Sequence, residues 1–150
     1  MKSEATATIP LLEIRDLSVS FGALPAVNRV SFVLNRGETL ALVGESGSGK
    51  SVSALSILQL LPYPHARHPG GSIRLRGEEL LGAAPDRLRE VRGNRIAMVF
   101  QEPMTSLNPL HSIEKQIGET LSLHKGLSGA RRRARILQLL ELVGLPDATH

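Results

Sequence analysis

One stretch of the 150-residue chain has residue types and spacing suited to binding phosphate: residues 44–51 read Gly-Glu-Ser-Gly-Ser-Gly-Lys-Ser. They match the pattern G-x-x-x-x-G-K-[ST], in which glycines let the backbone approach an anion and successive N–H groups point at its oxygens. Lys50 would place an ammonium charge beside the outer phosphates, and the Ser51 hydroxyl would ligate Mg²⁺. The pattern predicts a site for ATP and Mg²⁺ made of Gly44, Glu45, Ser46, Gly47, Ser48, Gly49, Lys50, Ser51 and Val52.

The segments that flank this loop have the character that such a site requires. Residues 39–43 are apolar at nearly every position, which is typical of a strand covered on both faces in a parallel sheet. The segment after Lys50 is apolar around most of its circumference as far as Pro62 and predicts a buried helix. A loop between a strand and a helix has the amino end of the helix beside it, where an anion is stabilised.

Apolar alternation predicts further strands and helices. The alternation that begins at Leu12 changes phase between Ile14 and Leu17, so we expect a β-bulge near Arg15 and Asp16. The order of strands, loop, helix, strand and helices indicates an α/β fold. The other expected elements are a strand over 30–34, a hairpin around Gly77, a short helix from Pro85, a covered strand over 95–100, and helices over 112–125 and 128–143.

The composition excludes several classes of protein. Hydrophobic residues make up 41% and charged residues 21% of the chain, which is typical of a globular protein and not of a disordered one. There is no cysteine, so disulfides, thiolate zinc sites and cysteine nucleophiles are excluded, and a reducing compartment is favoured. Prolines interrupt the longest uncharged stretch, residues 51–66, so no segment is expected to span a membrane. The net charge of +4 suits an anionic partner.

The loop at 44–51, together with the run Val-Phe-Gln-Glu-Pro-Met-Thr-Ser-Leu-Asn-Pro at 99–109, resembles the ATP-binding subunit of an ABC importer of the oligopeptide and dipeptide class. Within that class the chain is most similar to the branch associated with broad peptide and microcin C uptake. The resemblance implies a P-loop NTPase fold, the ABC nucleotide-binding domain. It implies a flexible tail at 1–10, a β subdomain with the phosphate loop, the Q-loop and part of a parallel core sheet at 11–110, and the start of a helical subdomain at 111–150.

The resemblance also assigns roles to two residues outside the loop. It implies that Gln101 is the Q-loop glutamine, which reaches Mg²⁺ and the attacking water, so that Lys50 and Gln101 are the expected catalytic residues and Ser51 and Gln101 the expected metal contacts. It implies that Phe21, 23 residues before Gly44, is the aromatic side chain on which adenine stacks. Plainer interpretations stay open, because Phe21 could be packed in the core and Gln101 could cap a strand end.

The function implied by the resemblance is ATP binding and, in a full-length subunit, ATP hydrolysis that powers import of peptides or peptide-like compounds across the bacterial inner membrane. The implied partners are transmembrane permease subunits, a second ATP-binding subunit or domain and, indirectly, a periplasmic substrate-binding protein, without nucleic acid. The implied location is the cytoplasmic face of that membrane. The family's signature, second carboxylate motif and switch histidine are not found, so we expect the amino-terminal portion of a longer subunit, inactive alone.

Two other functions use the same loop: a small P-loop kinase and a non-hydrolytic nucleotide-binding module. A kinase also needs arginines, which the basic run at 131–135 could supply, but no aspartate follows an apolar strand and the run at 101–109 has no role there. We interpret 131–135 as a solvated helix face. The tract at 127–131 imitates the signature but follows Gln101 too closely, and Ser128 is expected to be a helix N-cap. His65 and His68 lack a third ligand for a metal site.

Overall fold

The computed structural model describes residues 9–100 and 107–145, which form parts of two compact units, Met1–Arg89 and Glu90–His150. This division reflects only how compactly each part of the chain is packed, and it does not test the domain limits. The limits that the sequence suggests, at residues 10 and 110, therefore stay predictions.

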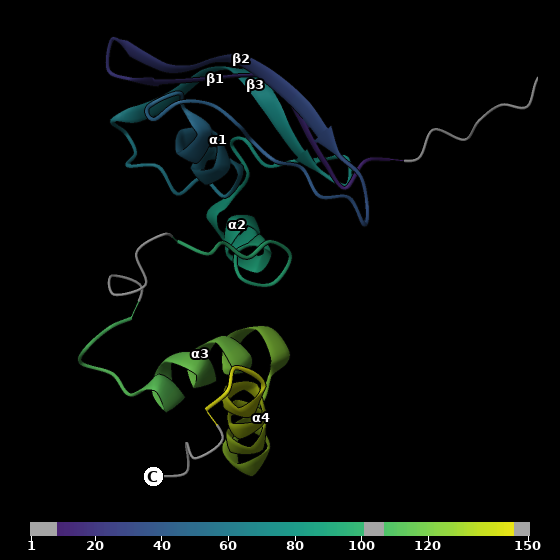
Figure 1. The fold of residues 1–150 in the computed structure, drawn as a ribbon, viewed down its shortest axis with the longest axis vertical. Helices are drawn as coiled ribbons and strands as arrows, with labels where there is room; N and C mark the ends of the chain where they lie inside the picture. Colours follow the sequence, from purple (N-terminus) through teal and green to yellow (C-terminus); the bar gives the residue numbers. More distant parts are fainter. Residues whose placement is uncertain (1–8, 101–106, 146–150) are drawn as a thin grey trace, which may run out of the picture. The chain divides into compact units, whose positions relative to one another are not determined.

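The first unit is built on a four-stranded antiparallel sheet (Figure 1). β1 (Leu12–Phe21) pairs with β2 (Leu24–Leu34) on one side and with β3 (Ala66–Leu75) on the other. β4 (Glu78–Glu79) pairs with the end of β3, so the strand order is β2-β1-β3-β4. The predicted hairpin around Gly77 is confirmed as the β3–β4 pair. β1 is therefore the central strand that both of its long neighbours share.

The predicted β-bulge in β1 is confirmed. Ile14 pairs with Phe32 and Leu17 pairs with Val30, so three steps along β1 correspond to two steps along β2. Asp16 lies within the bulge at a φ of +46°. The extra residue changes which positions face inward, and this explains why Ile14 and Leu17 are both buried, at 1% and 0% exposure.

Helix α1 (Lys50–Ile57) packs against β1 and β2 on one face of the sheet (Figure 1). The prediction of a buried helix that continues to Pro62 is wrong in two respects. The helix ends at Ile57, and its own buried residues are Ser53 and Ser56. Leu58 and Leu61, which are also buried, follow the helix. The apolar residues around this segment therefore do not identify the face of α1 that is buried. That face is marked by two serines three positions apart.

The two segments expected as covered strands of a parallel sheet, 39–43 and 95–100, form no strand in the described part of the chain. Leu40 is 41% exposed and Val43 is 91% exposed. The second segment has one isolated parallel bridge, at Ile96. A covered strand needs hydrogen-bonding neighbours at its edges, and no described strand pairs with either segment. The prediction of part of a parallel core sheet is therefore wrong for the described residues.

The second unit contains two helices that pack against each other, α3 (Ile113–Lys125) and α4 (Gly129–Leu142) (Figure 1). Both were expected from the apolar periodicity, and both begin and end within one residue of the predicted bounds. Leu121 on α3 and Ile136 on α4 are buried, with exposures of 9% and 2%. A Cβ atom on Gly118 would lie 3.5 Å from the Cδ1 atom of Ile136, so a small residue lets the two helices approach closely.

The starts of the helices agree with the sequence in position. The short helix α2 (Pro85–Val91), within which the two compact units meet in sequence, begins at the expected proline. Ser112 caps α3, because its Oγ atom accepts a hydrogen bond of 3.2 Å from the Lys115 N–H. Ser128 holds the N-cap position of α4 but makes no side-chain cap hydrogen bond.

None of the helices within 9–100 and 107–145 is long and apolar enough to cross a bilayer.

Candidate nucleotide-binding site

The candidate site is the loop at 44–51, and its glycines are required by the backbone. Gly47 and Gly49 adopt φ angles of +80° and +87°, which L side chains rarely adopt. A Cβ atom on Gly49 would lie 2.6 Å from the Ala26 carbonyl oxygen and 3.1 Å from Cγ2 of Val27. Gly49 is therefore required twice, by its conformation and by the close contact between the loop and β2.

The amino end of α1 adjoins the loop, and neither a side-chain cap nor an acidic residue in the first turn offsets the positive end of the helix dipole. Gly49 is the N-cap, makes no side-chain cap hydrogen bond, and is followed by a first turn without an acidic residue. Its carbonyl oxygen accepts a hydrogen bond of 2.8 Å from the Ser53 N–H, which closes the first turn. The preceding N–H groups have no intrahelical acceptor, and the helix dipole favours a negative charge beside them. This helix end is therefore suited to a phosphate group.

The ammonium group of Lys50 is held over the loop by hydrogen bonds to the loop itself. Nζ donates to the carbonyl oxygens of Gly44 at 2.8 Å and Glu45 at 2.6 Å, and to Oγ of Ser48 at 3.2 Å. The Ser48 N–H also donates to the Glu45 carbonyl oxygen at 3.2 Å, which closes the turn. The loop therefore holds a positive charge in position before any anion arrives.

The remaining loop residues are accessible. Ser46, Ser48 and Ser51 are exposed, whereas Val52 is half-buried and its carbonyl oxygen accepts a 2.7 Å hydrogen bond from Oγ of Ser56. In the ranges that the structure covers, the Ser51 hydroxyl makes no hydrogen bond and is available as a ligand. The structure therefore brings all the predicted loop residues, Gly44 to Val52, together in one solvent-accessible segment.

Phe21, the predicted adenine platform, is half-buried at the end of β1. Val19, two residues earlier, pairs with Val27, which packs against Gly49. Side chains alternate along a strand, so Phe21 leaves β1 on the same face as Val19. Its ring lies beside the imidazole of His65, with centroids 6.0 Å apart and planes inclined by 46°. No local sequence pattern indicates His65 as a neighbour of Phe21, because the two residues are brought together by the pairing of β1 with β3.

Gln101, the other predicted catalytic residue, lies outside the described residues. The described segment before α3, at 107–112, is held by a residue that sequence reasoning missed. The Gln116 side chain accepts a hydrogen bond from the Asn108 N–H at 3.0 Å and donates to the carbonyl oxygens of Asn108 at 3.1 Å and His111 at 2.9 Å. A glutamine in the first turns of an amphipathic helix carries no sequence signal for this role.

Glu79 and His68 of the first unit have shifted pKa values, and neither residue lies in the loop. Partial burial acts to raise the pKa of Glu79, but the hydrogen bonds that it accepts from Ser72, Ile73, Leu81 and Arg74 outweigh burial, so its pKa lies below the ordinary value. Burial lowers the pKa of His68. The described residues contain no group of three or more metal-ligating side chains.

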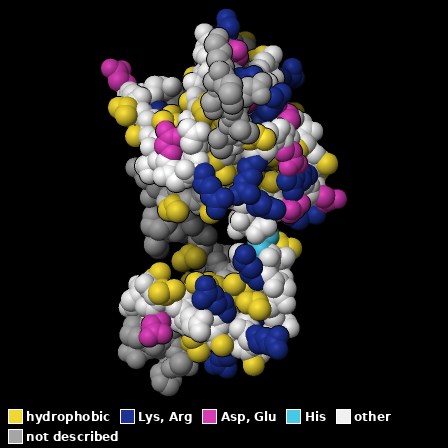
Figure 2. Space-filling view, turned by 90° about the vertical axis from the view of Figure 1, so that its right-hand side faces the viewer, with side chains coloured by type: hydrophobic (Ala, Val, Ile, Leu, Met, Phe, Trp, Pro, Cys, Tyr) yellow, Lys and Arg dark blue, Asp and Glu magenta, His cyan; other side chains and the backbone are white. Residues whose placement is uncertain are grey.

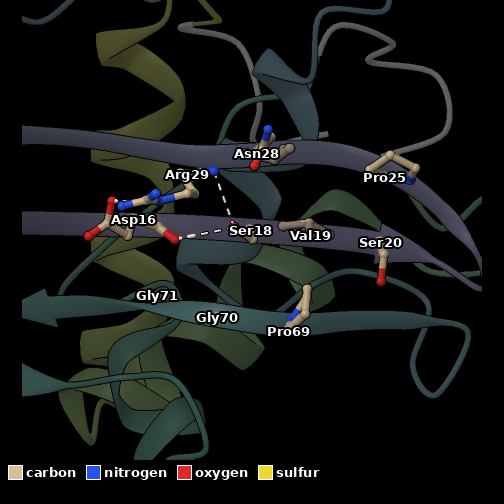
Figure 3. Close-up of a pocket in the computed structure, with 11 residues that line it drawn as sticks. Asp16, Ser18, Val19, Ser20, Pro25, Asn28, Arg29, Pro69, Gly70 and Gly71 are labelled. Carbon is tan, nitrogen blue, oxygen red and sulfur yellow. Dashed lines mark hydrogen bonds and ion pairs between the residues drawn. The ribbon is translucent and has the colours of Figure 1, made fainter.

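A hollow of the first unit, about 440 Å³ in volume, lies along β1 at the bulge (Figure 3). Its polar groups bind one another. The Arg29 N–H donates to Oγ of Ser18 at 3.1 Å, the Ser18 hydroxyl donates to the Asp16 carbonyl oxygen at 3.3 Å, and the Arg29 guanidinium lies 3.4 Å from the Asp16 carboxylate. These groups stabilise the bulge, and the loop at 44–51 remains the better candidate for a binding site.

Cationic side chains lie on the surface of both units (Figure 2). On α4, Arg132 packs over Gly118 and donates to Oγ of Ser122 at 3.2 Å, so it is a packing residue. The other arginines of this run are exposed, in agreement with a solvated helix face: Arg131, Arg133 and Arg135.

Comparison with known proteins identifies the family. A family model described as ABC transporter matches residues 27–150. The chain is 60% identical over 146 residues to the peptidoglycan transport ATP-binding protein YejF of Agrobacterium fabrum (strain C58), covering 95% of this chain and 27% of that protein. It is 46% identical over 140 residues to the oligopeptide transport ATP-binding protein OppD of Bacillus subtilis (strain 168), covering 91% of this chain and 39% of that protein.

A similar solved structure is that of a dimeric ATP-binding cassette in a post-hydrolysis state bound to ADP and Pi. It is 25% identical, has a TM-score of 0.72, and is matched over 87% of this chain and 56% of that chain. The chain thus spans about a quarter to two-fifths of the two curated relatives and about half of the solved one. The predicted fold class, the ABC nucleotide-binding domain, is confirmed, and the chain belongs to the ATP-binding subunits of the ABC transporter family.

Proposed function

We propose that the loop at 44–52 binds Mg-ATP and that, within an importer, hydrolysis of this ATP powers the uptake of peptides or peptide-like compounds. The observation that carries the proposal is the Lys50 ammonium group, held over an exposed loop at the uncapped amino end of α1. The names of the relatives support the cargo, since one is a peptidoglycan transport protein and another an oligopeptide transport protein.

The residues of the loop have different roles in binding Mg-ATP. The N–H groups from Gly47 to Ser51 donate to phosphate oxygens, and Lys50 exchanges its hydrogen bonds to Gly44 and Glu45 for bonds to the β and γ phosphates. The exposed Ser51 hydroxyl fits a hard cation such as Mg²⁺. Mg²⁺, when bound, neutralises charge on the β and γ phosphates. Since the described residues offer no cluster of metal ligands, Ser51 would share the ion with phosphate oxygens.

Phe21 and Gln101 complete the proposed site. The half-buried ring of Phe21 would stack on adenine, which is supported by its position on the face of the sheet that carries the loop. Gln101 would contact Mg²⁺ and orient the attacking water, a role that rests on the resemblance of the run at 99–109 to the family's Q-loop.

The proposed partners follow from the relatives. We infer that the protein works with transmembrane permease subunits, with a second ATP-binding subunit or domain and, indirectly, with a periplasmic substrate-binding protein, at the cytoplasmic face of the bacterial inner membrane. The similarity to transport proteins supports the inference of permease partners. The solved cassette named above is dimeric, which supports the inference of a second ATP-binding subunit or domain. We also infer that these 150 residues alone bind ATP without turnover, because none of the three aspartates follows an apolar strand segment.

A calorimetric titration with Mg-ATP tests the proposal. Lys50→Ala should weaken binding at least about 10-fold, because a charge-assisted contact to the phosphates is lost. The matched control is Lys125→Ala, which removes the same charge from the end of α3 and should leave the affinity unchanged. Equal affinities for the protein and its Lys50→Ala variant would refute the site. Phosphate release measured in the same samples tests whether binding occurs without turnover, and acceptor-dependent ATP consumption would indicate a kinase instead.

A further inference from the structure

We propose that His65 is a second aromatic contact for the nucleobase, beside Phe21, and that the pair gives the site its preference for a purine nucleoside triphosphate over a bare polyphosphate. This inference rests on the proposed function, because it assumes that the triphosphate tail is bound by residues 44–51.

The two rings are held together by the backbone on both sides. Phe21 ends β1 and pairs with Ala66, the first residue of β3. The Gly22 N–H donates a hydrogen bond of 3.3 Å to the His65 carbonyl oxygen. The ring centroids lie 6.0 Å apart with the planes inclined by 46°, which is within the range for interacting aromatic pairs. Phe21 and His65 therefore form one aromatic corner whose geometry is fixed by the strand pairing.

This aromatic corner lies on the side of the sheet that carries the phosphate loop. Gly49 touches β2 at Val27, and Val27 pairs with Val19 on β1. Phe21 lies two residues beyond Val19, an advance of about 7 Å along the strand, on the same face. With a strand spacing of about 4.8 Å, Phe21 lies about 8 Å from Val27, where the loop touches the sheet. This separation is comparable to the reach of an extended nucleotide from its outer phosphates to its base.

His65 has the accessibility that a ligand contact needs. Its side chain is exposed, and the described residues give neither ring nitrogen a hydrogen-bond partner. His68, three residues later, differs in both respects, because it is partly buried and its Nδ1 atom lies 3.4 Å from the Tyr63 hydroxyl. Phe21 offers only a ring face, whereas the His65 imidazole adds a nitrogen that can bond the edge of a purine.

The test separates the base from the phosphates by using two probes, Mg-ATP and Mg-tripolyphosphate, each titrated calorimetrically. His65→Ala should weaken ATP binding about 3- to 10-fold and leave tripolyphosphate binding unchanged, because tripolyphosphate has no base. His65→Phe should retain part of the ATP affinity. His111→Ala, which removes an imidazole from the segment before α3, should change neither affinity.

A double-mutant cycle makes the test specific to a shared base. Phe21→Ala combined with His65→Ala should weaken ATP binding by less than the product of the single effects, since the two side chains contact the same group. Unchanged ATP affinity in His65→Ala, with a loss in Phe21→Ala, would overturn the inference and leave the proposed function standing. Equal losses for both probes in His65→Ala would also overturn it. If the unsubstituted protein bound neither probe, the proposed function itself would fail.

Discussion

Gly49 lies directly against Ala26, so that a Cβ atom on Gly49 would be 2.6 Å from the Ala26 carbonyl oxygen. This contact joins the phosphate loop to strand β2 of the antiparallel sheet. Because α1 begins at the next residue, Lys50, the same contact also positions the helix end that phosphates would approach in the proposed site. The sheet therefore determines where the proposed anion site lies.

Replacement of Gly49 by alanine should destabilise the protein more than replacement of Gly47. Both residues have a positive φ, at +87° and +80°, and an alanine at either position has an unfavourable conformation by about 1–2 kcal/mol. Only Gly49 has backbone atoms where the Cβ would lie, which adds about 1–3 kcal/mol of overpacking. Urea unfolding of the two variants measures the difference, and equal free energies of unfolding would show that the contact with Ala26 is not tight.

The bulge in β1 gives a second matched pair of glycines, Gly70 and Gly71. A Cβ atom on Gly71, at a φ of +109°, would lie 2.6 Å from Cα of Leu17, whereas one on Gly70 would meet nothing within 4 Å. Gly71→Ala should lower the free energy of unfolding by about 2 kcal/mol or more, and Gly70→Ala by less than about 1 kcal/mol. Similar losses in chemical denaturation would contradict the bulge geometry.

Gln116 should hold the segment before α3 in place. Gln116→Ala removes the bonds to Asn108 and His111 and should lower the free energy of unfolding by about 1–2 kcal/mol. Hydrogen exchange at the Asn108 amide should become faster. The control is Gln138→Ala. The Gln138 side chain is exposed and, within the described residues, has a hydrogen bond only with Arg135. Unchanged exchange at Asn108 in the Gln116 variant would argue against the role.

Glu79 should make the first unit sensitive to acid. Its pKa is lowered in the folded protein, so its contribution to stability is complete above the ordinary value of 4.5 and is lost as the pH falls through the folded value. Glu79→Gln should therefore flatten the fall in stability below pH 4.5. Glu119→Gln changes an exposed carboxylate on α3. The stability of this variant should fall with pH in parallel with that of the unsubstituted protein. Denaturant titrations at several pH values test this, and parallel curves for all three proteins would refute it.

The features predicted correctly from the sequence are those encoded locally. The loop at 44–51 is eight consecutive residues whose types alone specify the glycine conformations and the lysine at the helix start, and its binding of phosphate stays a prediction. The bulge is visible because a one-residue insertion changes the phase of a two-residue period. The helices α3 and α4 follow from apolar spacing and from serines at their N-cap positions.

The features that the sequence did not predict depend on distant neighbours. Residues 39–43 are apolar enough for a covered strand, but a strand also needs partners, and the described sheet provides none for them. The neighbourhood of Phe21 and His65 follows from the pairing of β1 with β3, which no short pattern reveals. Ser53 and Ser56, the buried residues of α1, are polar, so a hydrophobic pattern points away from them.

Residue-resolved NMR of the backbone amides tests the central claim most directly, that main-chain N–H groups of the loop bind the triphosphate. On addition of Mg-AMPPNP, the amide signals of the loop should shift with one-to-one saturation, and in Lys50→Ala they should shift only at much higher nucleotide concentration. The signals to follow are those of Gly47, Ser48, Gly49, Lys50 and Ser51. Unchanged loop amides at millimolar nucleotide, or equal responses in the protein and its Lys50→Ala variant, would contradict the account.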